Sequence, residues 1–145
     1  MKIDRFKMIA SGYLLLIRNG KILLLRRFQT GYEDGKYSVP AGHVEDNESL
    51  LHSTCREICE EVGLVLKPKD LKLVHVMHRK SNDIRMDFFF TTDKKGLVPK
   101  NTEPHKADDL RWFFISKLPT NTIPYIRAAI NKYRKKIFYS EFGWK

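Results

Sequence analysis

Apolar positions along the chain form short runs separated by polar or glycine-containing turns, and in two segments the spacing becomes helical. The short runs predict β-strands over residues 9–17, 21–27, 71–78, 84–92 and 110–115. Asn19-Gly20, a pair typical of tight hairpins, separates the first two runs. We therefore expect the first two strands to pair with each other.

The helical spacing occurs first from about Glu48 to Val62 and again from Ile123 to about Phe138. Gly63 is expected to end the first helix, because glycine readily adopts the left-handed conformation just past a helix C-terminus. Pro124 is tolerated in the first turn of the second helix. Polar loops are expected over residues 28–36 and 94–108, with a short extended piece over 36–40.

The order of these elements predicts a single α/β domain over residues 1–145. The chain has no linker-like segment and no repeat of solenoid length. Its hydrophobic content of 42% and aromatic content of 12% are ordinary for a globular chain and too high for a disordered one.

The chain is expected to be cytoplasmic. Basic residues before the first apolar run resemble the start of a signal peptide, but Asp4 interrupts them and a second apolar run follows. No apolar stretch approaches the roughly 18 to 20 residues of a membrane span, so no membrane partner is expected. Cys55 and Cys59 lie four residues apart in a predicted helix, which favours buried, reduced thiols over a disulfide.

The first helix places three carboxylates on one face. At about 100° per residue, Glu57, Glu60 and Glu61 share a sector roughly 100° wide. The apolar stripe elsewhere on the helix is formed by Leu51, Cys55, Ile58, Cys59 and Val62. Three like charges on adjacent turns repel, and a divalent cation such as Mg²⁺ or Mn²⁺ would offset that repulsion. Arg56, four residues before Glu60, can pair with it and offset part of the same repulsion. The alternative is a solvated acidic face without a metal.

The formal net charge of the chain is +10, although acid is concentrated in this helix. An excess of basic over acidic residues favours an anionic partner: a nucleic acid, a membrane surface or a phosphorylated metabolite. The alternative is a basic surface that serves solubility alone. An acidic metal patch within a basic field fits an enzyme that attracts polyanionic nucleotides.

Residues 42–64 carry the pattern G-x5-E-x7-R-E-U-x-E-E-x-G-U, where U is a bulky apolar residue. Every fixed position is filled, by Gly42, Glu48, Arg56, Glu57, Ile58, Glu60, Glu61, Gly63 and Leu64. The segment thereby resembles the Nudix box, and the order of elements around it resembles a Nudix hydrolase from end to end. Residues 139–144 resemble the ending of a small bacterial subgroup. The resemblance implies an α/β/α sandwich with a mixed central sheet.

Nudix hydrolases cleave a diphosphate linkage in a nucleoside diphosphate joined to another group, with Mg²⁺ or Mn²⁺ as cofactor. The resemblance implies metal ligands at the Gly42 carbonyl and at Glu57, Glu60 and Glu61. It also implies that Arg56 orients the glutamates and that Glu48 braces the loop against the helix.

The resemblance leaves the general base open, because relatives place it either in the box or on a later loop. Glu57 is the candidate in the box, and Glu103 is the candidate on the loop. The stretch Glu103-Pro104-His105-Lys106 resembles one found in nucleotide-cleaving relatives, and an exposed loop carboxylate is the alternative. His105 and Ala107 stand where glutamate and cysteine are frequent, which leaves the substrate open.

Substrate contacts are expected from the basic and aromatic residues near the box. Arg26 and Arg27 close a strand and point to opposite faces, so one of them can reach the cleft and bind phosphate. Tyr32 is a candidate for stacking on a base, and Lys106 is a candidate for binding phosphate.

The sequence therefore predicts a Mg²⁺-dependent hydrolase that cleaves a nucleoside or deoxynucleoside triphosphate, oxidised or not, to the monophosphate. One alternative is a pyrophosphohydrolase of RNA 5′ ends, which the charge favours. Others are a nucleotide-sugar or ADP-ribose hydrolase and, ranked last, a binding module without activity. A homodimer is left open.

Overall fold

The computed structural model describes residues 3–145, so the first two residues of the predicted domain lie outside it. The strands are β1 (Ile9–Leu14), β2 (Ile17–Arg18), β3 (Lys21–Arg27), β4 (Tyr37–Ser38), β5 (Ala41–His43), β6 (Lys72–Lys80), β7 (Ile84–Thr91), β8 (Ala107–Phe114) and β9 (Tyr139–Phe142). The helices are α1 (Leu50–Val62), a short 3₁₀ helix η1 (Pro68–Asp70) and α2 (Pro124–Arg134).

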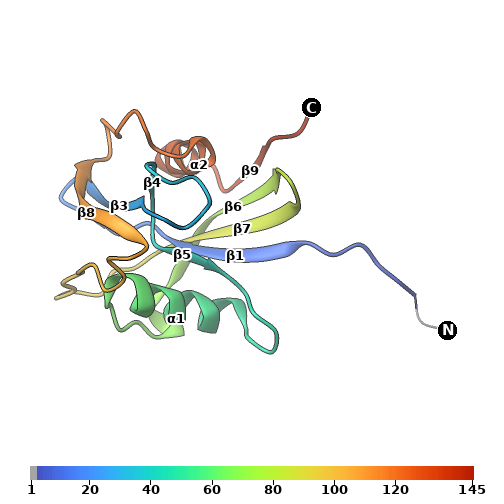
Figure 1. Ribbon diagram of the computed structural model, residues 1–145, viewed down its shortest axis with the longest axis horizontal. Coiled ribbons are helices and arrows are strands. Elements are labelled where there is room, and N and C mark those ends of the chain that lie inside the picture. Colours follow the sequence, from blue (N-terminus) through green and yellow to red (C-terminus); the bar gives the residue numbers. More distant parts are fainter. Residues whose placement is uncertain (1–2) are drawn as a thin grey trace.

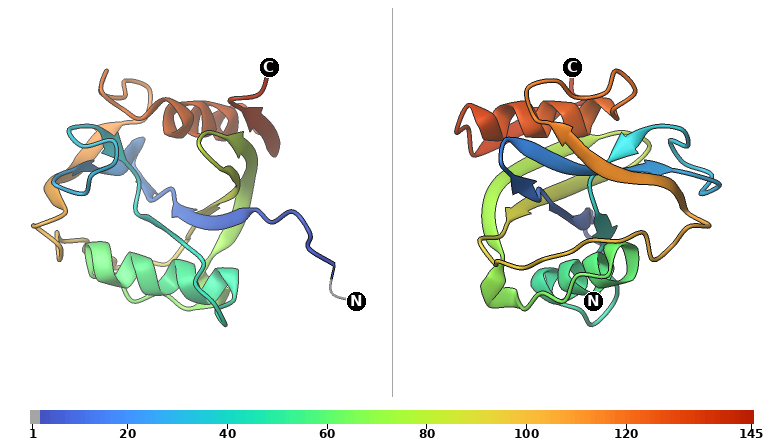
Figure 2. Two further views of the ribbon diagram at one scale, coloured as in Figure 1. Left: turned by 45° about the vertical axis from the view of Figure 1, so that its right-hand side comes forward. Right: turned by 90° about the vertical axis from the view of Figure 1, so that its left-hand side faces the viewer.

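The strands form two sheets, and the helices lie on opposite sides of them (Figures 1 and 2). The first sheet has the order β5-β1-β7-β6-β9, and in the second β3 pairs with β2, β4 and β8. β1 runs parallel to β7, whereas β6 and β7 are antiparallel, so the first sheet is mixed. Ile126 and Ile130 of α2 belong to one apolar core, and Ile58 and Val62 of α1 belong to a second. The predicted α/β/α sandwich is confirmed.

The predicted pairing of the first two strands is wrong for most of its length. β1 pairs with β5 and β7 in the first sheet, and only the two residues of β2 pair with β3 around Asn19 and Gly20. The chain changes sheets at Leu15 and Leu16, which are fully buried in different cores. Leu15 packs in one core and Leu16 in the other. The run of apolar residues therefore continues past the point where β1 ends.

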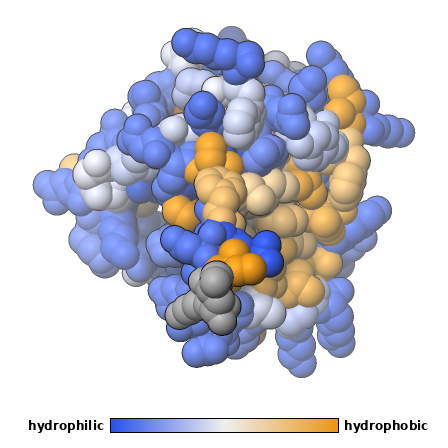
Figure 3. All heavy atoms as spheres, turned by 90° about the vertical axis from the view of Figure 1, so that its right-hand side faces the viewer, coloured by the Kyte–Doolittle hydropathy of each residue, from blue (hydrophilic) through white to orange (hydrophobic). Residues whose placement is uncertain are grey.

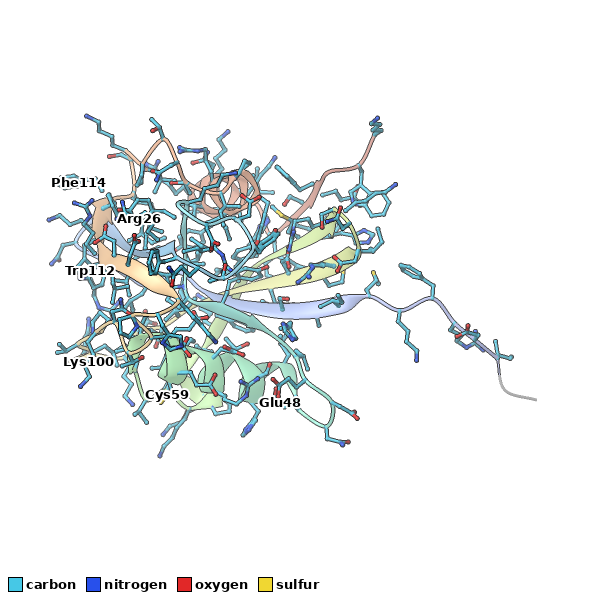
Figure 4. All side chains as sticks on the ribbon, in the orientation of Figure 1. Arg26, Glu48, Cys59, Lys100, Trp112 and Phe114 are labelled. Carbon is cyan, nitrogen blue, oxygen red and sulfur yellow. The ribbon has the colours of Figure 1, made fainter. Side chains whose placement is uncertain are left out.

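Helix α1 begins two residues later than predicted, because Ser49 caps it by accepting the N–H of His52. Its end is confirmed: Gly63 is left-handed, with a φ of 68°, and donates its N–H to the Cys59 carbonyl. Its buried face differs from the predicted apolar stripe. Thr54 is buried and Cys59 is exposed on the outer side of the helix (Figure 4).

The buried face of α1 differs from the predicted apolar stripe because the helix lies very close to β1. A Cβ on Gly12 would lie 1.8 Å from Oγ1 of Thr54, so only glycine lets the helix rest on this strand. Small polar side chains of α1 are thus buried against the sheet, while Cys55 is half-buried. The expectation of two buried thiols is wrong for Cys59.

The second helix ends at Arg134, four residues earlier than predicted, and Lys136 adopts a left-handed φ of 60°. The chain then forms β9, which runs parallel to β6 and becomes the edge of the first sheet. Trp144 donates its indole N–H to the His78 carbonyl at 3.0 Å. The C-terminal residues thus fasten the β6–β7 hairpin.

The surface beside the N-terminal segment is apolar. Phe6 and Met8 are exposed just before β1, and Figure 3 shows apolar side chains gathered on this face of the molecule. No helix within residues 3–145 is long and apolar enough to cross a membrane.

Candidate active site

A cleft of about 580 Å³ opens between the two sheets, beside one face of α1. The predicted site residues that line it are Arg27, Tyr32, Gly42, Glu57, Glu61, Glu103 and Lys106. Arg26, Arg56 and Glu60 are predicted site residues that do not line it. The cleft therefore collects residues from β3, from the loop after it, from β5, from α1 and from the loop before β8.

Glu61 is the most enclosed of the carboxylates. It accepts the backbone N–H of Ala41 at 2.9 Å, which ties the helix to the start of β5. Burial raises the pKa of Glu61 to about 8, opposed by the Ala41 N–H and reinforced by the charges of Glu57 and Glu103. A carboxyl group with such a pKa and two like neighbours favours a bound cation.

Glu57 lies over the backbone of β5. A Cβ on Gly42 would lie 2.1 Å from Cγ of Glu57, so glycine at this position makes room for the carboxylate. Burial also raises the pKa of Glu57, and the Arg56 guanidinium opposes that effect. The three cleft carboxylates, Glu57, Glu61 and Glu103, are hereafter called the acidic end of the cleft.

Arg56 joins the carboxylates of the box. Its Nε donates to Glu48 at 2.7 Å, and its Nη2 donates to the other oxygen of Glu48 at 2.8 Å. Its Nη1 donates to Glu57 at 3.0 Å and to Glu60 at 3.3 Å. The guanidinium holds the pKa of Glu48 at about 2. These contacts fit the predicted roles of Arg56 as an orienting residue and of Glu48 as a brace, which lies at the start of α1 (Figure 4).

Glu60 points away from the cleft lining, and nearly half of its side chain is exposed. Glu60 forms the ion pair with Arg56 that their spacing of four residues predicts. Arg26 pairs with Asp108 at 2.7 Å on the β3–β8 side of the molecule (Figure 4). The alternation along β3 thus sends Arg27, and not Arg26, into the cleft.

Arg27 is held by the loop that follows β3. Its Nε donates to the Tyr32 carbonyl at 2.7 Å, and its Nη2 donates to the Thr30 hydroxyl at 3.0 Å. The guanidinium also lies over the Tyr32 ring, 5.4 Å from its centroid. Its charge lowers the pKa of Glu61, so a phosphate bound at the acidic end would meet this cation.

The loop that carries Glu103 is anchored on the C-terminal end of α1 (Figure 2). The hydroxyl of Thr102 donates to the Glu60 carbonyl at 2.5 Å, and the Thr102 N–H donates to the Glu61 carbonyl. Asn101 accepts the Glu103 N–H and donates to the Ala107 carbonyl. This loop holds the Glu103 carboxylate in the cleft, 3.7 Å from the ammonium of Lys106.

Several cleft residues were missed by the sequence analysis. Arg79 of β6, Arg85 of β7 and Tyr125 of α2 line the cleft far from the box in sequence. The alternation of buried positions along β6 puts Arg79 on the same face as His75 and Met77. A charged residue on an otherwise buried strand face was the signal that could have found it.

The donor set at the acidic end fits a hard divalent cation. Within residues 3–145, no three acidic, histidine or cysteine side chains converge closely enough to hold a metal ion as they stand. Three carboxylates nevertheless line one cleft, and the charges of neighbouring carboxylates contribute to the raised pKa values of Glu57 and Glu61. Oxygen ligands of this kind suit Mg²⁺ or Mn²⁺.

Comparison with known proteins places this arrangement in a class. The family model of the NUDIX domain matches residues 8–133. A MutT NUDIX hydrolase from Burkholderia pseudomallei has a similar structure, with a TM-score of 0.77 and 25% identity over 87% of this chain and 98% of that one. The fold and the carboxylate-bearing helix are those of a small Nudix hydrolase.

Curated relatives are similar at about the same level. The NAD-capped RNA hydrolase NudC of Stutzerimonas stutzeri is 28% identical over 94% of this chain, which spans only 46% of that protein. The 8-oxo-dGTP diphosphatase of Buchnera aphidicola is 27% identical over 86% of this chain and 92% of its own length. The chain belongs to the Nudix family, whose hydrolases generally use divalent metals.

Proposed function

We propose that this chain uses Mg²⁺, or Mn²⁺ in its place, to hydrolyse a nucleoside or deoxynucleoside triphosphate, oxidised or not, to the monophosphate. The observation that carries this proposal is the acidic end of the cleft, where Glu61 lies near Glu57 and Glu103 beside the guanidinium of Arg27. Support also comes from the relative of nearly matching length that is named an 8-oxo-dGTP diphosphatase.

The ligands for the cation would be Glu57, Glu60, Glu61 and the Gly42 carbonyl, as the Nudix box implies. A bound divalent cation neutralises phosphate charge and lowers the pKa of water in such sites. Glu60 is paired with Arg56 outside the cleft lining, so Glu60 could bind the cation only if its side chain turned toward the cleft. Glu61 already lines the cleft and needs no such rearrangement.

The protein's own cations would bind the phosphates. Arg27 is fixed by the Tyr32 carbonyl and the Thr30 hydroxyl, so its charge is held beside Glu61 before substrate arrives. Lys106 lines the same cleft just before β8, next to Arg27 in the register of β3 and β8. Two neighbouring cations beside the acidic end can hold a polyphosphate there.

Glu103 is the carboxylate best placed to accept the proton of the attacking water. Glu57 is engaged by Arg56 and is needed as a ligand, whereas Glu103 lies on the anchored loop, where its ion-pair partner is Lys106. A general base must reach the water without giving up a ligand role. Between the two candidate bases, we therefore propose Glu103.

A pyrophosphohydrolase of RNA 5′ ends is the second candidate function. The net charge of +10 favours it, and one relative is named an NAD-capped RNA hydrolase. RNA binding through phosphates would weaken steeply as salt rises. A cytoplasmic location and a homodimer stay predictions, although the apolar face near Phe6 and Met8 offers a surface for the latter.

A substrate panel read by mass spectrometry tests the proposal. The panel contains nucleoside triphosphates and their oxidised forms, nucleotide sugars, ADP-ribose and 5′-triphosphate RNA, each with Mg²⁺ and with Mn²⁺. We expect the triphosphates to give monophosphate and pyrophosphate. Activity on RNA ends alone would favour the second candidate, and no activity on any member would leave a binding module as the better reading.

A further inference from the structure

The end of the cleft remote from the carboxylates carries two guanidinium groups. Arg79 of β6 and Arg85 of β7 are direct partners in the antiparallel register, and both line the cleft. They come from strands that the Nudix box does not include. We call these two residues the basic end of the cleft.

Arg79 is fixed and neutralised by buried partners. Its side chain is almost fully buried, and its Nε donates to Asp87 at 2.6 Å. The guanidinium also lies 3.6 Å from the centroid of the Tyr125 ring. Asp87 accepts the Arg79 hydrogen bond with one carboxylate oxygen, and with the other it accepts a hydrogen bond from the Tyr13 hydroxyl at 2.8 Å. The carboxylate of Asp87 is therefore already committed, and it does not line the cleft.

Arg85 keeps an edge of its guanidinium for a ligand. Its Nε and Nη2 donate to the two oxygens of Asp83, at 2.8 and 3.2 Å, and about a quarter of its side chain is exposed. Within residues 3–145, Nη1 makes no hydrogen bond to the protein. Asp83 holds the guanidinium through Nε and Nη2, and Arg85 lines the cleft.

The two ends of the cleft are separated by about the length of a nucleotide. Gly42 lies on β5 beneath Glu57, and β7 is two strands away in the order β5-β1-β7. Adjacent strands lie about 4.8 Å apart, and Arg85 lies three residues along β7 from Phe88, the residue in line with Gly42, so the Cα atoms of Gly42 and Arg85 are roughly 14 Å apart along the sheet. A nucleotide whose phosphates lie at the acidic end can bridge this distance together with the long Arg85 side chain.

We propose that Arg85 selects the nucleobase and favours guanine, a proposal that rests on the proposed nucleotide substrate. Arginine offers only donors, and the O6 and N7 atoms of guanine are two adjacent acceptors. Adenine places an amino group where guanine has O6, and cytosine also presents an amino group. Arg79 is a second donor at this end, and the two carboxylates beside these arginines, Asp83 and Asp87, are each already bonded to one of them.

Equilibrium binding of GMP and AMP tests this role without requiring turnover. The wild-type protein should bind GMP at least about tenfold more tightly than AMP. Arg85→Gln should bring the ratio close to one by weakening GMP alone. Arg85→Lys keeps the charge but loses the planar fork, so the preference should also fall while AMP affinity is unchanged. Arg134→Gln, on the exposed end of α2, is the matched control and should keep the wild-type ratio.

The alternative outcomes separate this role from others. Equal loss of GMP and AMP affinity in Arg85→Gln would mean that the residue binds phosphate, and the proposal would be overturned. A wild-type protein with no preference would overturn it as well. If GMP preference depends on Arg85 but no triphosphate is hydrolysed, the base site stands and the proposed function fails.

Discussion

Gly42 and Glu57 occupy one another's space: a Cβ on Gly42 would lie 2.3 Å from the carboxyl carbon of Glu57. The glycine of the Nudix box thus determines where the first carboxylate of the acidic end lies. Gly12, its partner on β1, makes the corresponding room for Thr54 of α1. Two paired glycines therefore allow α1 to approach the sheet. Gly42 lies beneath Glu57 of the candidate site, and Gly12 lies beneath Thr54, which packs the helix on β1.

Gly42→Ala should separate catalysis from folding. The new methyl group displaces the Glu57 carboxylate, and misplacement of about 1 Å at a reacting centre costs on the order of 100-fold in rate. Gly12→Ala instead forces Thr54 away from β1, and overpacking of this kind costs about 1–3 kcal/mol in stability. Turnover and the melting temperature of both variants check this contrast. Wild-type turnover in a folded Gly42→Ala protein would contradict the proposed position of the metal ligands.

The ion pair between Glu48 and Arg56 should protect the fold in acid. The Arg56 guanidinium lowers the pKa of Glu48 to about 2 from an ordinary value near 4.5. A lowered carboxyl pKa gives stability that is present above about pH 4.5 and is lost as the pH falls toward 2. Glu48→Gln should flatten that part of the pH profile of the melting temperature. Glu45→Gln is the control: the Glu45 side chain is exposed and lies 3.8 Å from Arg56, so its loss should leave the profile unchanged.

Glu103→Gln should slow the chemical step without weakening metal binding. Loss of a general base typically costs about 10²- to 10⁴-fold in rate. Glu61→Gln should instead weaken Mn²⁺ binding, which electron paramagnetic resonance of free Mn²⁺ measures directly. If Glu103→Gln keeps its turnover while Glu57→Gln loses it at saturating metal, the base lies in the box.

His75 should make stability fall in mild acid. Its side chain is fully buried, with Nδ1 2.8 Å from the Ile137 carbonyl and Nε2 2.8 Å from the Ser140 hydroxyl. Burial lowers the pKa of His75, so the neutral ring stabilises the fold above about pH 6.5 and this contribution is lost as the pH falls below it. His75→Asn should reduce the slope of the melting temperature between pH 5 and 6.5, whereas His52→Gln, on the exposed face of α1, should not. The upper end of this range is the ordinary histidine pKa of about 6.5.

The sequence was sufficient to predict those features that depend on local pattern. The end of α1 at Gly63, the loop after β3 and the contacts of Arg56 with its glutamates all follow from residues close together in the chain. The sandwich followed from the order of elements and the family resemblance. These features are set by backbone preference and helical spacing.

Features that depend on distant contacts were missed. The apolar run through Leu15 and Leu16 gave no sign that the chain changes sheets there, because both residues are buried whichever sheet they join. Arg79 and Arg85 meet only through the β6–β7 register. Cys59 is exposed because α1 packs on β1 through the contact of Thr54 with Gly12. The helical spacing of α1 alone does not predict a contact with a distant strand.

Hydrolysis of GTP in ¹⁸O-labelled water tests the central claim most directly. With Mg²⁺, the wild-type protein should release GMP and pyrophosphate, with one ¹⁸O atom in one of the two products. Removal of the metal by a chelator, or the change Glu61→Gln, should abolish both products. Release of GDP and phosphate, or the same products from Glu61→Gln at the wild-type rate, would contradict the account.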